Sequence, residues 1–194
     1  EDYERYKQYV TNEKFDIIHD HSWFAFPYIS KMNDPKLKVL HTNHGGYSWE
    51  SCPPVSHPNL VAISDFMKQY TIQYFNQRGY NVDCQYVHNG IDLDKYPFDQ
   101  NIKKTNRLLY VGRLSTFKQP HIGVELARKT NHKLDIIGGT FIDSNDYVKQ
   151  LDKLCENDPN INIYKDVTHE FKIKKIQEAK ALIFPSKMGE PFGL

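Results

Sequence analysis

Arg113 and Lys118, five positions apart, carry side chains that suit the binding of a diphosphate. An arginine offers two parallel hydrogen bonds to phosphate oxygens, and a lysine offers a compact point charge. Both follow an apolar segment at 107–111, which we predict to be a strand that ends at Gly112. Either cation alone would be an ordinary solvated surface residue. Their joint position after one strand predicts a diphosphate site.

The segment Glu190-Pro191-Phe192-Gly193-Leu194 suits the binding of a sugar. It follows an apolar strand predicted at 181–184, and ligands of open α/β sheets bind at the carboxyl ends of the strands. The Glu190 carboxylate can accept hydrogen bonds from sugar hydroxyl groups, and the amides of Phe192, Gly193 and Leu194 can donate to the sugar or to phosphates. The alternative is a surface turn with a solvated glutamate.

The histidines of the first half form a third group of candidates. His44 follows a predicted strand and precedes Gly45-Gly46, where backbone can approach a ligand closely. A histidine that is only hydrogen-bonded within its loop is the alternative, and His41, still inside the strand, is the competing position. His19 and His21 share one face of another predicted strand, but no third ligand stands at a useful spacing, so we predict no metal site.

Three glycines are candidates for a nucleotide-binding loop. Gly112 follows the predicted strand at 107–111, and Gly138 and Gly139 follow another at 134–137. A glycine at a strand end allows a nucleotide to approach the backbone. A plain tight turn explains the Gly138-Gly139 pair almost as well.

Strand-like and helix-like segments alternate along the whole chain. We predict strands at 15–20, 37–41, 60–64, 85–87, 107–111, 134–137, 161–164 and 181–184. The predicted helices span 1–12, 23–32, a segment capped by Asp65 that ends before Gly79, 122–129, 146–156 and 169–179. This alternation predicts an α/β fold with doubly wound parallel sheets. A polar stretch predicts a linker at 93–105, which separates one domain at 1–92 from another at 106–194.

These motifs resemble those of retaining family-4 glycosyltransferases (glycosyl transferases group 1), which have the GT-B fold. Gly112-Arg113-Leu114 with Lys118 resembles the family's pyrophosphate clamp, and Glu190-Pro191-Phe192-Gly193-Leu194 resembles the opening of its Glu-x7-Glu signature. Further matches follow in the family's order at 15–21, 41–45, 61–64 and 87–92. The resemblance implies two Rossmann-like domains, the later part of an acceptor-side domain and the first part of a nucleotide-sugar-binding domain. We expect both to be incomplete, because the family's amino-terminal Gly-rich loop and second glutamate are not in this sequence.

The resemblance also implies an activity. We expect a retaining glycosyltransferase of the hexosyltransferase type, which moves a sugar from a nucleoside-diphosphate sugar to an unknown acceptor in glycan, glycolipid or glycoconjugate synthesis. It implies catalytic roles for His44, Arg113, Lys118 and Glu190, no metal and no cofactor. A nucleotide-sugar 2-epimerase and a non-catalytic nucleotide-sugar-binding fragment or scaffold are the alternatives.

Composition narrows the class of protein further. The net charge of +1 and pI of about 7.9 give no overall field that would recruit nucleic acid. Three scattered cysteines, Cys52, Cys84 and Cys155, favour free thiols in a reducing compartment. With no apolar run long enough to span a membrane, we expect a cytoplasmic protein and leave contact with the inner membrane face open. Incomplete sheets would also favour self-association through open edges and leave this chain inactive alone.

Overall fold

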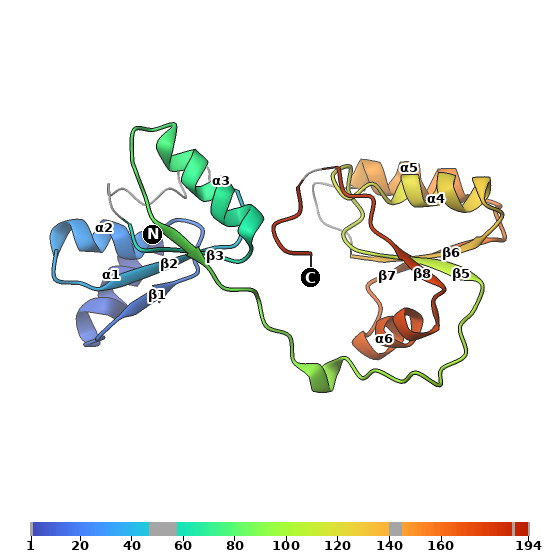
Figure 1. Ribbon diagram of the computed structural model, residues 1–194, viewed down its shortest axis with the longest axis horizontal. Coiled ribbons are helices and arrows are strands. Elements are labelled where there is room, and N and C mark those ends of the chain that lie inside the picture. Colours follow the sequence, from blue (N-terminus) through green and yellow to red (C-terminus); the bar gives the residue numbers. More distant parts are fainter. Residues whose placement is uncertain (1, 47–57, 140–144, 188, 194) are drawn as a thin grey trace. The chain divides into compact units, whose positions relative to one another are not determined.

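The computed structural model describes residues 2–46, 58–139, 145–187 and 189–193. The chain forms two compact units, which we describe separately (Figure 1). The first comprises Glu1–Ile91 together with Glu190–Leu194, and the second comprises Asp92–Gly189.

The first unit is built on a parallel sheet of four strands in the order β1-β2-β3-β4. The strands are β1 (Ile18–Asp20), β2 (Val39–Asn43), β3 (Leu60–Ala62) and β4 (Cys84–Tyr86), and the helices are α1 (Asp2–Asn12), α2 (Phe26–Asn33) and α3 (Asp65–Asn76). The register places Asp20 of β1 beside His41 of β2. Because the strands are parallel, their carboxyl ends lie at one edge of the sheet.

The N-cap of helix α3 is Ser64. The side chain of Ser64 accepts a hydrogen bond from the Met67 amide at 3.1 Å, as an N-cap does. The prediction that Asp65 caps this helix is therefore wrong by one position, and Asp65 instead places a negative charge in the first turn. The core beneath α3 includes Met67 and Phe75, which are fully buried against β3 and β4.

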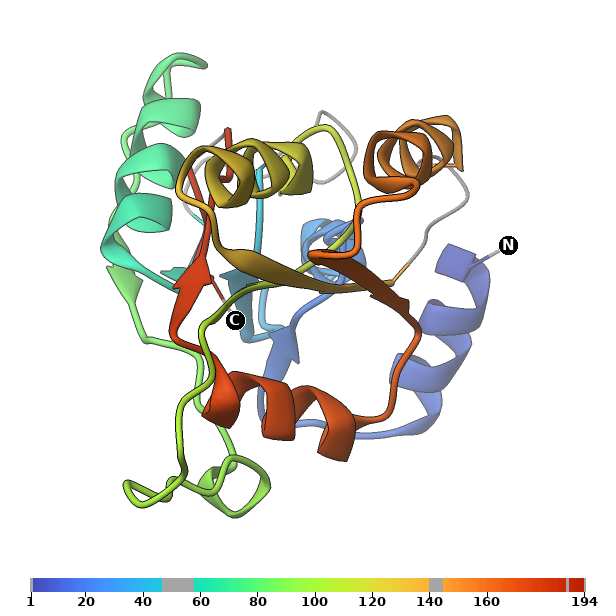
Figure 2. The ribbon, with the colours of Figure 1, turned by 90° about the vertical axis from the view of Figure 1, so that its right-hand side faces the viewer.

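The second unit has a parallel sheet in the order β7-β6-β5-β8. Its strands are β5 (Arg107–Val111), β6 (Lys133–Gly138), β7 (Ile161–Lys165) and β8 (Ala181–Ile183). The α-helices are α4 (Pro120–Lys129), α5 (Asn145–Cys155) and α6 (His169–Glu178), and a short 3-10 helix spans Leu93–Lys95. Helices α4 and α5 cover one face of the sheet and α6 covers the other (Figures 1 and 2).

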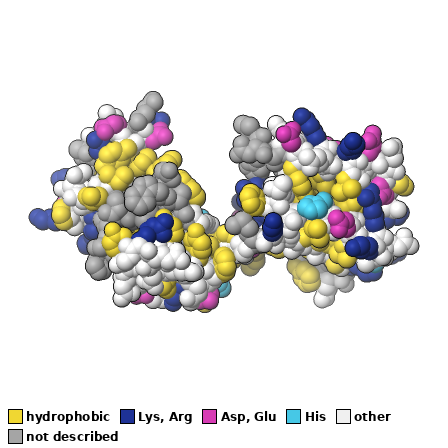
Figure 3. Space-filling view, turned by 90° about the horizontal axis from the view of Figure 1, so that it is seen from above, with side chains coloured by type: hydrophobic (Ala, Val, Ile, Leu, Met, Phe, Trp, Pro, Cys, Tyr) yellow, Lys and Arg dark blue, Asp and Glu magenta, His cyan; other side chains and the backbone are white. Residues whose placement is uncertain are grey.

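The core of the second unit lies between this sheet and helices α4 and α5. Leu134, Ile136 and Val124 are fully buried there, and Leu114 joins them from the loop after β5. On the outer face of α4 and α5, apolar and charged side chains of both signs are intermixed (Figure 3). The buried apolar layer between the sheet and these helices supports the carboxyl ends of β5 and β6.

A buried carboxylate joins several elements of the second unit. Asp135 on β6 is 3% exposed and accepts hydrogen bonds from Arg107 Nε at 2.7 Å and Lys175 Nζ at 2.9 Å. Asn162 of β7 donates a further bond at 2.9 Å. Burial raises the pKa of Asp135, but the hydrogen bonds from Lys175, Arg107 and Asn162 outweigh it and leave the pKa below its ordinary value. This network ties α6 to three strands.

The α/β fold with two parallel sheets confirms the predicted fold class. Cys84 and Cys155 are buried free thiols, and burial raises the pKa of each to about 11, whereas Cys52 lies outside the described residues. No helix in the described ranges is both long and apolar enough to cross a membrane.

Candidate functional site

The predicted diphosphate loop leaves the sheet at the carboxyl end of β5. The Gly112 amide donates to the Ile137 carbonyl at 3.0 Å, and the Leu114 amide donates to the Gly139 carbonyl at 3.3 Å. These bonds continue the pairing of β5 with β6 beyond the strands. The fully buried Leu114 side chain then anchors the loop in the core.

Gly138 is a glycine because the backbone of this loop lies against it. A Cβ at this position would lie 2.2 Å from the Gly112 carbonyl oxygen and 2.7 Å from the Leu114 side chain. Gly112 is less restricted, since its Cβ would meet the Tyr110 hydroxyl at 3.0 Å. Close packing of the two loops accounts for Gly138, and Gly139 beside it is half-buried.

Arg113 and Lys118 lie on this same loop. Arg113 is exposed, and its carbonyl accepts a hydrogen bond from the Tyr110 hydroxyl at 2.8 Å. The Lys118 amide donates to Ser115 at 3.2 Å, and its Nζ lies 5.8 Å from the centre of the Phe184 ring. The loop is also bonded to the segment after β8, where the Lys187 amide donates to Phe117 at 2.9 Å. Both cations are therefore held on a braced loop at the carboxyl end of β5.

The segment that contains Glu190 packs within the first unit. The carbonyl of Pro191 accepts a short hydrogen bond from the Ser64 hydroxyl, and Phe192 packs against the core beneath α3. The Phe192 ring lies 5.6 Å from the ring of His88, and Gly193 adopts a positive φ of 88°. Glu190 itself is half-buried, and Leu194 lies outside the described residues. The predicted sugar-binding segment and the diphosphate loop thus belong to different units.

His44 follows β2 directly and lines a pocket of about 220 Å³ at the carboxyl ends of β1 and β2. Its Nε2 lies 2.8 Å from Nδ1 of His21. The pocket is lined by His21, Ser22, Trp23, His41, Thr42, Asn43, His44, Gly45 and Gly46. His41, the competing candidate, is buried inside β2, so the more exposed imidazole of this strand end belongs to His44.

The residues beside His44 are held by partners on β1 and α3. His19 Nε2 lies 2.7 Å from Thr42 Oγ1, and His41 Nδ1 lies 2.8 Å from Asp20 Oδ2. Asn43 donates to Thr71 at 3.0 Å and accepts from the Gly45 amide at 3.1 Å. No local sequence pattern predicts these pairs. Polar residues at the ends of two neighbouring predicted strands are the signal that indicates them.

Burial and neighbouring imidazoles set the charge of this cluster. Burial lowers the pKa of His44, and the nearby imidazoles of His21, His41 and His19 lower it further. Burial raises the pKa of Asp20, but hydrogen bonds from His41 and Ser22 outweigh it, and its pKa lies below the ordinary value. The cluster therefore favours an ionised Asp20 carboxylate, bonded to His41, and a neutral His44. Within the described part of the chain, no group of three or more His, Cys, Asp or Glu could hold a metal ion.

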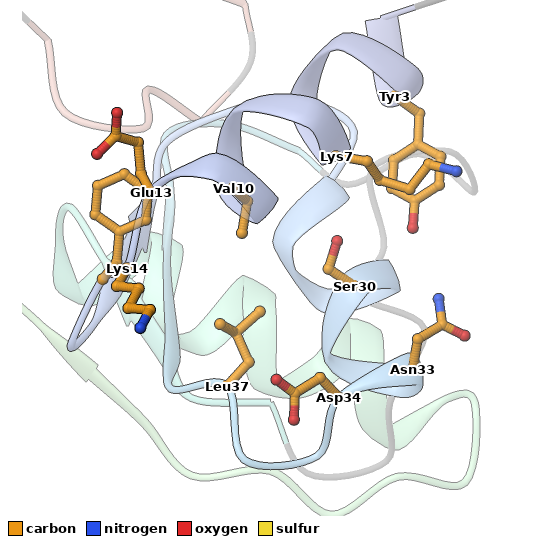
Figure 4. A pocket seen from close by; sticks show the side chains of 10 residues that line it. Tyr3, Lys7, Val10, Glu13, Lys14, Ser30, Asn33, Asp34 and Leu37 are labelled. Atoms are coloured by element: carbon orange, nitrogen blue, oxygen red, sulfur yellow. The ribbon is translucent and has the colours of Figure 1, made fainter.

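A second pocket, of about 430 Å³, lies between α1 and α2 (Figure 4). Tyr3 and Lys7 of α1 and Ser30 and Asn33 of α2 surround it, together with Val10, Glu13, Lys14, Phe15, Asp34 and Leu37. Two of the lining residues, Phe15 and Leu37, come shortly before β1 and β2 in the sequence. The pocket therefore lies toward the amino ends of these strands. Open parallel sheets bind ligands at the opposite edge, which favours the pocket beside His44 as the functional one.

Two family models match the sequence. Residues 92–194 match the family model of glycosyl transferases group 1, and residues 2–95 match that of Glycosyltransferase Family 4. The chain belongs to the glycosyl transferases group 1 family. No functionally curated protein matches the sequence.

Solved structures show the fold of this group 1 chain. A glycosyltransferase from Rickettsia africae superposes with a TM-score of 0.76 at 17% identity, over 98% of this chain and 56% of its own length. Sucrose-phosphate synthase from Thermosynechococcus elongatus gives 0.70 at 16% identity, over 99% and 55%. The catalytic domain of starch synthase IV from Arabidopsis thaliana, bound to ADP and acarbose, gives 0.64 at 13% identity, over 100% and 56%. The chain spans about half the length of these structures.

These findings confirm the predicted family and a GT-B-like fold for this group 1 chain. Arg113 and Lys118 share one loop, His44 lies in a strand-end pocket, and Glu190 packs in the first unit; their functions stay predictions.

Proposed function

We propose that this chain is part of a retaining glycosyltransferase of the hexosyltransferase type, which transfers a sugar from a nucleoside-diphosphate sugar to an acceptor. Membership of the group 1 family supports a nucleotide-sugar donor. The observation that carries the proposal for this chain is the braced loop after β5, which presents Arg113 and Lys118 at a strand end. Glycan, glycolipid or glycoconjugate synthesis is the process we assign to it.

The proposed chemistry begins with the bond between the sugar and the diphosphate. As this bond breaks, negative charge grows on the leaving phosphate and partial positive charge grows on the sugar. Arg113 and Lys118 stabilise the phosphate charge, because fixed cations aimed at developing charge lower the barrier most effectively. Glu190 accepts hydrogen bonds from the sugar hydroxyls, and His44 contacts the donor sugar. The leaving phosphate takes the proton of the acceptor hydroxyl, so that no separate base is required.

The proposal also covers the partners of the protein. It binds a nucleotide sugar and a glycosyl acceptor, needs no metal or nucleic acid, and works in the cytoplasm, with contact at the inner membrane face left open. Because the chain spans about half the length of its structural relatives, we propose that it is not a competent enzyme alone. Open sheet edges then lead it to associate with copies of itself or with complementary segments.

Product analysis with a protein that spans the full family fold tests this function. Nucleoside-diphosphate sugars are incubated with it, and the anomeric protons of the products are followed by NMR. We expect release of the nucleoside diphosphate and transfer of the sugar, to an acceptor or to water, with its anomeric configuration retained. Conversion to a 2-epimer that stays on the nucleotide would show an epimerase, and binding without turnover would show a non-catalytic module.

A further inference from the structure

The backbone beside His44 is held by the Asn43 side chain, which accepts a hydrogen bond from the Gly45 amide and is itself anchored to Thr71. The imidazole of His44 contacts the side chain of His21, whose Nδ1 lies 2.8 Å from His44 Nε2. This hydrogen bond gives the imidazole a defined orientation.

His21 is itself firmly placed. The Asp20 carboxylate accepts a hydrogen bond from the Ser22 amide at 2.8 Å, which fixes the backbone on both sides of His21. The centre of its ring lies 4.2 Å from that of His19, and His19 is bound to Thr42 at 2.7 Å. The turn after β1 thus supports His21 through its backbone and its ring.

The hydrogen bond between the two imidazoles restricts their protonation. One of the two nitrogens must carry the proton while the other offers its lone pair, so the tautomer of His44 is coupled to that of His21. The bond survives one added proton, on the ring that donates. It is lost when both rings are protonated, because both nitrogens are then donors. The other ionisable groups that act on His44 are His19 of β1 and His41 of β2, and Asp20 acts in turn on His19.

We propose that His21 is a positioning residue, which fixes the orientation of His44 for its contact with the donor sugar and couples the tautomer of His44 to its own. The proposal rests on the transferase function proposed above, in which His44 contacts that sugar. It explains why a histidine stands at the end of each of two neighbouring strands, His21 after β1 and His44 after β2, without a metal role for either.

The first part of the test measures the tautomers of the histidine rings directly. Proton–nitrogen NMR spectra of the histidine rings are recorded between about pH 5 and pH 9, around the ordinary histidine pKa. We expect the ratio of the two His44 tautomers to change in His21→Ala, because the coupling to His21 is lost. His21→Asn should restore a hydrogen bond to His44 Nε2, because an asparagine amide can occupy the position of Nδ1. His132→Ala, in the second unit, is the control that should leave His44 unchanged.

The second part measures kcat and KM in a protein that spans the full family fold. His21→Ala should lower kcat by about 10- to 100-fold, the scale of a misplaced reacting group, with the KM for nucleotide sugar nearly unchanged. His21→Asn should recover most of the loss. An unchanged ratio of His44 tautomers in His21→Ala, an unchanged kcat, or a failure of His21→Asn to recover kcat would overturn the proposal. A changed tautomer ratio in His21→Ala, in a protein whose native form turns over no nucleotide sugar, would instead refute the proposed function.

Discussion

At the scale of single residues, Arg113 and Lys118 can hold a diphosphate only while the loop between them keeps its shape. Leu114 anchors that loop in the core, and the Tyr110 hydroxyl holds the Arg113 carbonyl at 2.8 Å. The backbone that carries both cations is therefore ordered without a ligand. In the proposed site, the arginine supplies planar hydrogen bonds and the lysine a point charge to one diphosphate.

Removal of either cation should weaken the binding of a nucleoside diphosphate. Arg113→Ala and Lys118→Ala should each cost roughly 1.5–3 kcal/mol of binding free energy, the range for hydrogen bonds to charged groups. The double variant should cost less than the sum, because both side chains contact one ligand. Calorimetric titration measures these values, with Lys129→Ala at the far end of α4 as the control. Unchanged affinity in both single variants would remove the clamp from this account.

Glu190 should contribute to the binding of the sugar and not to the binding of the nucleotide. In Glu190→Ala we expect the affinity for free nucleoside diphosphate to stay close to that of the native chain. The additional affinity of the matching nucleotide sugar should disappear, since the lost carboxylate can no longer accept hydrogen bonds from the sugar. Parallel titrations with the two ligands measure the difference, and Glu156→Ala on the surface of the second unit is the control. An equal loss for both ligands would assign Glu190 to the ribose or to folding.

At the scale of elements, the contact between the ends of β5 and β6 controls the shape of the diphosphate loop. Gly138→Ala places a Cβ 2.2 Å from the Gly112 carbonyl oxygen, so the loop must move. We expect a loss of roughly 1–3 kcal/mol in the free energy of unfolding, as for other overpacked sites, and weaker binding of nucleoside diphosphates. Gly90→Ala, where a Cβ meets nothing within 4 Å, is the matched control. Equal stability of the two variants in urea titrations would refute this packing argument.

The buried carboxylate of Asp135 should make the second unit sensitive to acid. Its pKa in the folded chain lies below the unfolded value, so its contribution to stability is complete above the unfolded pKa and is lost as the pH falls toward the folded one. Asp135→Asn should cost roughly 3–5 kcal/mol at neutral pH, because it leaves Arg107 and Lys175 without their carboxylate. The deficit should shrink below about pH 4.

Urea titrations across this pH range, with amide signals of the second unit as the probe, measure the effect of Asp135→Asn. Asp146→Asn is the control, since the Asp146 side chain is 93% exposed and lies 3.7 Å from Lys149. The control should change stability little at any pH. A deficit that stays constant from neutral to acid pH would show that the Asp135 charge is not what the variant removes.

Local sequence patterns were sufficient to predict most elements, and contacts between distant residues were not. β5 was predicted at 107–111 and has these bounds, because an apolar run ends at a glycine. The predicted cap of α3, Asp65, lies one residue after the observed cap, Ser64, because both residue types are good caps. The pairs His19–Thr42 and His21–His44 each join residues 23 positions apart, so they depend on the register of β1 and β2, which no local pattern specifies.

At the scale of the whole molecule, the residues with proposed roles are distributed over both units. The second unit holds the diphosphate loop, and the first holds the pocket beside His44 and the segment that contains Glu190. The group 1 family match extends from 92 to 194 and so includes both Arg113 and Glu190.

The most direct measurement of the central claim is a calorimetric comparison of UDP, GDP and ADP with the corresponding monophosphates on the native chain. The account predicts that at least one diphosphate binds and that its monophosphate binds at least about tenfold more weakly. A tenfold change in affinity corresponds to about 1.4 kcal/mol. The charge-assisted hydrogen bonds of the second phosphate contribute more than that. Equal affinity for a diphosphate and its monophosphate, or no binding of any diphosphate, would contradict a nucleoside-diphosphate donor held by Arg113 and Lys118.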